Sequence, residues 1–235
     1  MTIPLPKKDL AYRLPIQKNS LILAAFAIVC TAIVGLVNEL TKDKIKDQAQ
    51  LQLLNTLHSI IEPNRYNNDI TQNCVAINSP LLGNNKMHTA YIARKSGKAV
   101  AIAMTSTAPN GYNGNIELII AINMDNSISG LRVLKHQETP GLGDKIELRK
   151  SHWITSFNNK KLLSKEDNRW AVIKDNGIFD QFTGATITPR AVVKAVKQTL
   201  VYFSENKYSL LTRPNICQLP TETKSIVDSE TKNEH

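Results

Sequence analysis

Residues 180–190 read DQFTGATITPR, and this stretch decides how the C-terminal part of the chain folds. Thr188 is a favoured N-cap residue, and Pro189 is favoured in the first turn of a helix. The apolar residues that follow recur at helical spacing: Val192, Val193, Val196 and Leu200. The sequence therefore predicts a helix that begins at Thr188 and Pro189, with Thr186 just ahead of its N-terminus.

Thr186 is expected to lie where a phosphate group is stabilised. The N–H groups of a first helical turn have no acceptor within the helix, and the positive end of the helix dipole lies at the same place. Both features favour a bound phosphate or phosphodiester. Thr, Gly and Ala are also common in an ordinary turn between a strand and a helix, so a purely structural connection remains the alternative.

The pattern Asp-x-x-Thr-Gly-Ala-Thr at residues 180–186 resembles the flavin-attachment motif of the FMN-binding domain family, which occurs in two related bacterial respiratory complexes. The resemblance implies that Thr186 carries FMN covalently, through the phosphate of the cofactor. It also implies that Asp180 helps a flavin transferase to recognise the site. The turn that lets the flavin phosphate approach the backbone is then formed by Thr183, Gly184 and Ala185.

A second segment, HQETPGLG at residues 136–143, follows a predicted strand. Its proline and glycines fix a tight backbone path, which a loop beside a flat ligand needs. The segment resembles the His-x-Glu-Thr-Pro-Gly-Leu-Gly loop of the same family and, with DKIE at 144–147, is similar to the version in the Rnf (Rsx) electron-transport complex. The related sodium-translocating NADH:quinone reductase is the near alternative. The resemblance places four residues in the flavin pocket: Glu138, Thr139, Gly141 and Leu142.

This loop also has a purely structural interpretation. Glu138 and Thr139 could serve as caps of a helix predicted at residues 142–157, and His136 could be a surface residue. A third segment, GYNG at residues 111–114, resembles the family loop that closes over the flavin. Tyr112 is then expected to stack on or bond to the ring system, although an exposed turn tyrosine fits the sequence equally well. Thr188 completes the predicted contacts of the cofactor.

An uncharged stretch at residues 19–38 is long enough to cross a membrane. At about 1.5 Å per residue it extends roughly 30 Å, the hydrocarbon thickness of a bilayer. A cleaved signal peptide is the alternative, but its apolar core is shorter, about 7–15 residues, and no small-x-small cleavage site lies directly before Glu39 at the end of the stretch. More uncompensated basic residues precede the stretch than follow it: Lys7, Lys8, Arg13 and Lys18. This bias predicts a cytoplasmic N-terminus and an exported remainder.

The composition excludes some other classes of function. The formal net charge is +9, yet the basic residues are scattered without a basic run or interleaved aromatic residues, which disfavours nucleic-acid binding. Cys30 falls within the uncharged stretch, and Cys74 and Cys217 can either bridge in an oxidising compartment or stay free. The sequence has no CxxC motif or His/Cys cluster, so we predict no metal site.

Strands in runs, with helices grouped around them, indicate an α+β fold instead of alternating βαβ units. Strands are predicted at residues 74–77, 89–94, 98–107, 116–123, 128–135 and 170–174. We expect a single N-terminal transmembrane helix followed by a mixed α+β FMN-binding domain. The predicted regions are a cytoplasmic N-terminus (1–18), a transmembrane helix (19–38), a helical stalk (39–62), the FMN-binding domain (63–211) and a disordered tail (212–235).

The resemblance implies an electron-transfer subunit that carries covalent FMN in a membrane complex coupling electron transfer to ion translocation. Its expected location is the bacterial inner membrane, with the soluble domain on the periplasmic side. Its expected partners are the other membrane subunits of a complex of the Rnf/Rsx type and, during maturation, a flavin transferase. We expect no turnover by this subunit alone, because no acid–base or nucleophile constellation is visible. The alternative is a membrane-anchored extracytoplasmic sensor or adaptor that binds a ligand without redox turnover.

Overall fold

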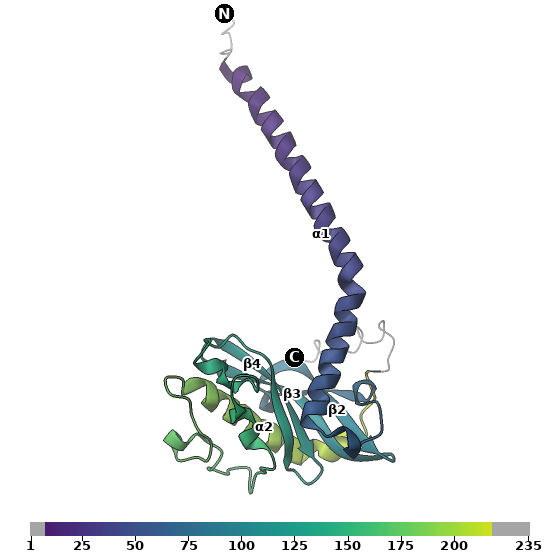
Figure 1. Cartoon of the computed structure of the whole chain (residues 1–235), viewed down its shortest axis with the longest axis vertical. Coiled ribbons are helices and arrows are strands. Elements are labelled where there is room, and N and C mark those ends of the chain that lie inside the picture. Colours follow the sequence, from purple (N-terminus) through teal and green to yellow (C-terminus); the bar gives the residue numbers. More distant parts are fainter. Residues whose placement is uncertain (1–7, 218–235) are drawn as a thin grey trace, which may run out of the picture. The chain divides into compact units, whose positions relative to one another are not determined.

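The computed structural model describes residues 8–217 and consists of two units, with the boundary between Leu51 and Gln52 (Figure 1). The first unit is the greater part of helix α1 (Lys8–Ile60). The second unit contains the end of α1 and a mixed α+β domain. The predicted fold class is therefore confirmed.

Helix α1 contains the uncharged stretch of the sequence. Among the described residues, one helical segment, Asn19–Ile60, is long and apolar enough to cross a membrane. Its large apolar side chains, such as Leu21, Phe26 and Val34, are exposed instead of packed in a protein core. Leaving apolar side chains of this size in water costs about 1.5–3 kcal/mol each compared with burying them. The segment is thus not the core helix of a globular unit. Its exposed apolar surface is compatible with the hydrocarbon interior of a bilayer.

The second unit is built on an antiparallel sheet in which neighbouring strands follow one another in sequence. The strands are β1 (Cys74–Ser79), β2 (Asn84–Lys95), β3 (Lys98–Gly111), β4 (Gly114–Asn123) and β5 (Ile128–Lys135). Short turns connect β2 to β3, β3 to β4 and β4 to β5, so these strands form successive hairpins. The tip between β3 and β4, at Tyr112 and Asn113, reaches the candidate site described below.

Each face of the sheet is covered by a different helix. Helix α2 (Ile187–Leu210) packs its apolar stripe against one face. That core includes Val192, Val196 and Leu200 from α2 and Ile102, Met104 and Ile120 from the sheet. The opposite face bears small side chains and packs against the last residues of α1 and the loop after it: Leu57, Ile60 and Ile61 against Ala101, Ala103 and Ala121. Alternation along β3 and β4 thus separates the two cores.

Two predictions for the segment between β5 and α2 were wrong. Residues 142–157 form two short 3-10 helices, η4 (Gly143–Ile146) and η5 (His152–Phe157), because Ser151 is extended and its hydroxyl caps η5 instead of continuing a helix. Residues 170–174 form no strand of the sheet. They contain an isolated bridge from Val172 to Phe179 and the 3-10 helix η6 (Ile173–Asp175). The rings of Trp170 and Phe179, on either side of this turn, pack 5.2 Å apart.

Three further 3-10 helices precede β2, namely η1 (Pro63–Arg65), η2 (Ile70–Gln72) and η3 (Pro80–Leu82). The first residues of the predicted disordered tail are held against β1. The Ile216 N–H donates to the Cys74 carbonyl over 3.0 Å, and the Arg213 guanidinium donates to the Ala76 carbonyl over 3.1 Å. Cys74 and Cys217 form a disulfide. The rest of the tail, residues 218–235, lies outside the described residues.

Candidate functional site

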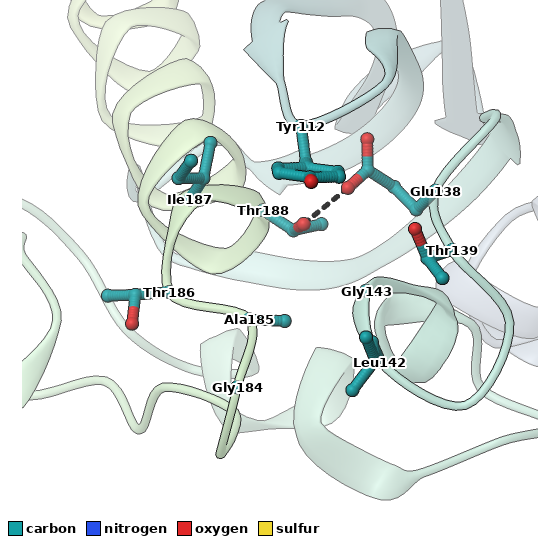
Figure 2. A pocket seen from close by; sticks show the side chains of 10 residues that line it. All are labelled: Tyr112, Glu138, Thr139, Leu142, Gly143, Gly184, Ala185, Thr186, Ile187 and Thr188. Carbon is teal, nitrogen blue, oxygen red and sulfur yellow. Dashed lines mark hydrogen bonds between the residues drawn. The ribbon is translucent and has the colours of Figure 1, made fainter.

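A cleft of about 260 Å³ lies between the start of α2, the β3–β4 tip and the loop that follows β5 (Figure 2). It is lined by Tyr112, Glu138, Thr139, Leu142, Gly143, Gly184, Ala185, Thr186, Ile187 and Thr188. The three sequence segments singled out above, far apart in the chain, therefore meet at one place. Three predicted site residues do not line the cleft, namely Gly141, Asp180 and Thr183.

The turn before α2 is fixed at both ends. The Ala185 N–H donates to the Phe182 carbonyl over 3.1 Å, and Gly184 adopts a φ of +80°, a conformation that glycine tolerates best. Phe182 is buried against Trp153, with ring centroids 5.2 Å apart. Buried packing thus anchors the turn, while Thr183 and Gly184 stay exposed at its tip.

Thr186 occupies the N-cap position of α2, as expected for a residue beside a helix N-terminus. Within the described residues its side chain makes no capping hydrogen bond. The side chain is half-buried, and Figure 2 shows it pointing away from Glu138 and Thr188. Its hydroxyl is thus not used in capping. It lies beside the backbone N–H groups of the first helical turn, which favour a phosphate.

Thr188 does not cap the helix, which corrects the prediction from the sequence. The helix begins at Ile187, so Thr188 lies inside the first turn. Its side chain is 1% exposed, and its hydroxyl donates a short hydrogen bond to the Glu138 carboxylate (Figure 2). Thr188 therefore connects α2 to the loop after β5 at the wall of the cleft.

Glu138 is a buried carboxylate, 4% exposed, with protein donors on both oxygens. Thr188 bonds to one oxygen, and the Asn113 backbone N–H donates to the other over 3.2 Å. Gly143 makes room for this arrangement, because a Cβ atom there would lie 2.8 Å from both the Glu138 carboxylate and the Thr188 hydroxyl. The sequence analysis did not assign Gly143 to the pocket, although the spacing of the two glycines in GLG pointed to a constrained loop.

His136 does not line the cleft but holds the backbone of Glu138. Its Nδ1 accepts a hydrogen bond from the Glu138 backbone N–H over 3.0 Å, so Nε2 is free to donate to Glu147 over 2.6 Å. The hydrogen bond from Arg149, together with the one from His136, lowers the pKa of Glu147 to about 2. His136 is thus neither a lining residue nor a free surface residue.

The rim of the cleft is apolar and open to solvent. Tyr112 is 68% exposed, Ile187 48% and Leu142 41%. Ile187 was not predicted, since the sequence pattern placed the start of the helix after it. Exposed aromatic and aliphatic side chains around a concave site favour a flat, largely apolar ring. A phosphate at Thr186 and such a ring between these side chains together fit the parts of FMN.

Comparison with known proteins agrees with this geometry. Residues 111–201 match the FMN-binding domain family, and residues 9–60 match the RnfG N-terminal region. The three segments that form the cleft lie within the first match. The fold and the site therefore define an FMN-binding domain that follows, in the sequence, a helix able to span a membrane.

Curated relatives narrow the assignment to the G subunit of the ion-translocating oxidoreductase complex. The protein of that name from Shewanella piezotolerans is 52% identical over 206 residues, covering 87% of this chain and 97% of the relative. The protein of the same name from Erwinia tasmaniensis is 50% identical, covering 80% of this chain and 89% of the relative. The one from Vibrio cholerae is 47% identical, covering 86% of this chain and 97% of the relative. The chain belongs to this G-subunit family, which confirms the resemblance seen in the sequence.

Proposed function

We propose that this chain carries FMN covalently on Thr186 and serves as an electron-transfer subunit of an ion-translocating membrane complex. Membership of the G-subunit family and the FMN-binding domain support the redox role. The observation that carries the covalent attachment is the position of Thr186. Its hydroxyl lies at the N-terminus of α2, where the backbone N–H groups and the helix dipole stabilise the negative charge of a phosphodiester.

The attachment step requires a separate flavin transferase. A threonine hydroxyl is a weak nucleophile without a base, and no base within the described part of the chain is hydrogen-bonded to Thr186. In the proposed step, Thr186 Oγ1 bonds to the flavin-side phosphorus of FAD, the bond between the two phosphates breaks, and AMP leaves. The proton of the hydroxyl passes to a base of the transferase. The exposed residues Asp180 and Thr183 flank the turn and are available for recognition.

Bound FMN supplies one- or two-electron redox chemistry, and the chain supplies retention, position and electrostatic surroundings. The cleft is slightly smaller than the roughly 300–1,000 Å³ usual for ligand pockets. The exposed apolar side chains of Tyr112, Leu142 and Ile187 would hold the ring at the open rim of the cleft, where another redox partner could reach it. The isolated chain is therefore expected to exchange electrons but not to catalyse turnover alone.

The proposed location is the periplasmic side of the inner membrane, with residues 19–38 in the bilayer and residues 1–18 in the cytoplasm. The disulfide between Cys74 and Cys217 supports export, because disulfides persist in oxidising compartments. In this arrangement residues 39–62 form the connection to the FMN-binding domain at 63–211. The other membrane subunits of the complex are the proposed partners for electron exchange.

The attachment is tested on full-length protein made in cells that contain the transferase. The tryptic peptide of residues 175–190 is expected to gain the mass of FMN less one water, and Thr186→Ala is expected to abolish the gain. Ser204→Ala is the control, because Ser204 is an exposed hydroxyl residue farther along α2 that does not line the cleft, so its loss should leave the label on Thr186. An unlabelled wild-type peptide would overturn covalent attachment, and ligand binding without any flavin would favour the sensor alternative.

A further inference from the structure

The Glu138 carboxylate joins three segments that are distant in sequence. One oxygen accepts from Thr188 on α2, and the other accepts from the Asn113 N–H at the β3–β4 tip. Its own backbone N–H is held by His136. Because both oxygens already have protein donors, direct binding of a ligand is not needed to explain why a carboxylate is buried here.

The β3–β4 tip has few other attachments. The side chain of Tyr112 is mostly exposed, and the structure gives it no hydrogen bond within the described part of the chain. Asn113 holds the tip through its N–H to Glu138 and through its amide Nδ2, which donates to the Gln137 carbonyl over 2.8 Å. Gly111 also packs tightly here, since a Cβ atom on it would lie 2.7 Å from Glu138 Oε1.

We propose that Glu138 is a positioning residue that holds the Tyr112 ring over the cleft by tying the β3–β4 tip to the first turn of α2. Figure 2 shows the Tyr112 ring between Ile187 and Glu138, next to the hydrogen bond between Glu138 and Thr188. The inference rests on the proposed function in one respect, since the ring that Tyr112 covers is that of FMN on Thr186. Glu138 then acts on the cofactor through Tyr112.

The first experiment uses the full-length Thr186→Ala chain, which carries no covalent flavin, so that the positioning role is judged separately from attachment. In this background, hydrogen exchange at the Asn113 amide is expected to be roughly fivefold to tenfold faster after Glu138→Ala, the loss of about one hydrogen bond. Glu138→Gln should retain protection, because its amide oxygen can still accept from Asn113 and its NH₂ can donate to the Thr188 hydroxyl.

Two more variants test whether the effect of Glu138→Ala comes from this hydrogen bond and not from a general loss of folding. Thr188→Val keeps the shape of the side chain but removes the donor to Glu138, so it should also speed exchange at Asn113. Glu166→Ala removes an exposed glutamate away from the cleft and should change nothing. Unchanged exchange at Asn113 in Glu138→Ala would overturn the proposal, whether or not the chain ever carries flavin.

The second experiment uses the loaded wild-type background, with attachment verified by peptide mass. An aromatic ring stacked on a flavin quenches its fluorescence, so Tyr112→Leu is expected to lengthen the emission lifetime. Glu138→Ala should lengthen it too, and Glu138→Gln should restore the quenching. The double variant Glu138→Ala/Tyr112→Leu should show no further increase, because one residue acts through the other. Additive effects, or a lifetime unchanged by Tyr112→Leu, would overturn the role of Tyr112.

Discussion

The indole Nε1 of Trp153 donates a hydrogen bond to the backbone carbonyl of Asp180 over 2.7 Å. Asp180 is the first residue of the proposed attachment motif, and its side chain is exposed. Trp153 itself is buried among aromatic rings, at 5.2 Å from both Phe157 and Phe182. The motif is therefore anchored by a packed aromatic cluster, while the side chain of Asp180, the proposed recognition group, faces solvent.

Replacing Trp153 with phenylalanine is expected to weaken this anchor. Trp153→Phe keeps an aromatic ring but leaves the Asp180 carbonyl without its donor, which costs roughly 1–3 kcal/mol of unfolding free energy. The less rigid turn should also be flavinylated more slowly. Thermal unfolding measures the first effect, and a time course of peptide labelling measures the second.

Trp170→Phe is the matched control for Trp153→Phe. Trp170 is buried next to Phe179, but its Nε1 has no hydrogen-bond partner among the described residues. Its replacement removes a buried unpaired donor and should cost less stability, with the labelling rate unchanged. Equal effects of the two substitutions on labelling would show that the bond from Trp153 to Asp180 does not matter for presenting the motif.

The conformation of Gly184 is the basis of a second prediction. Gly184→Ala places a side chain at a φ of +80°, which costs about 1–2 kcal/mol, although the added Cβ would meet only the Leu142 side chain at 3.5 Å. Gly97, in the turn between β2 and β3, has the same φ and open space around it. Gly97→Ala should therefore cost similar stability, as urea unfolding would show. Only Gly184→Ala should slow the labelling of Thr186, and equal labelling rates would contradict this role of the turn.

The sequence predicted the five strands of the sheet because each is a short run of strand-favouring residues bounded by turn residues. The short segments that it singled out do meet at one cleft, which is lined by the predicted residues Tyr112, Glu138, Thr139, Leu142, Gly184, Ala185, Thr186 and Thr188. The helix predicted at 142–157 was wrong because the extended Ser151 interrupts it and caps the short helix η5, although Trp153 and Phe157 do have helical spacing. Local spacing does not reveal which tertiary partner a side chain will find.

Thr188 illustrates the same limit at the site. Its residue type and the following proline favoured an N-cap, but the helix begins one residue earlier and the hydroxyl bonds to Glu138. The partner is fifty positions away in the chain, so no pattern near Thr188 could identify it. Ile187 and Gly143 were missed for a similar reason, because they become pocket residues only when three loops are brought together.

The lowered pKa of Glu147 gives a prediction about pH. The hydrogen bonds from Arg149 and His136 hold this pKa at about 2, below its usual value of 4.5, so the unfolded chain binds the proton more tightly. The stabilisation is therefore fully present above pH 4.5 and is lost as the pH falls towards 2. Glu147→Gln should lower the unfolding free energy at neutral pH by less than about 1 kcal/mol, because Arg149 is exposed and solvent screens the pair.

Denaturant unfolding at several pH values checks this dependence. The difference between wild type and Glu147→Gln should shrink between pH 4.5 and about 2. Glu166→Gln, which removes an exposed carboxylate away from this cluster, should leave the curve unchanged. A difference that stays constant across the acid range would mean that Glu147 stabilises the loop through packing instead of charge.

The disulfide between Cys74 and Cys217 leads to a prediction about both stability and location. It joins residues 143 positions apart and fastens the segment after α2 to the edge strand β1, so Cys74→Ser/Cys217→Ser should lower the unfolding free energy by roughly 2–4 kcal/mol. Urea unfolding followed by tryptophan fluorescence measures this loss.

The same disulfide gives a test of location. Because the chain has 3 cysteines, maleimide labelling of denatured protein from intact cells should modify Cys30 alone without reductant and all three after reduction. Reactive Cys74 and Cys217 in unreduced protein would argue against a domain in the oxidising periplasm.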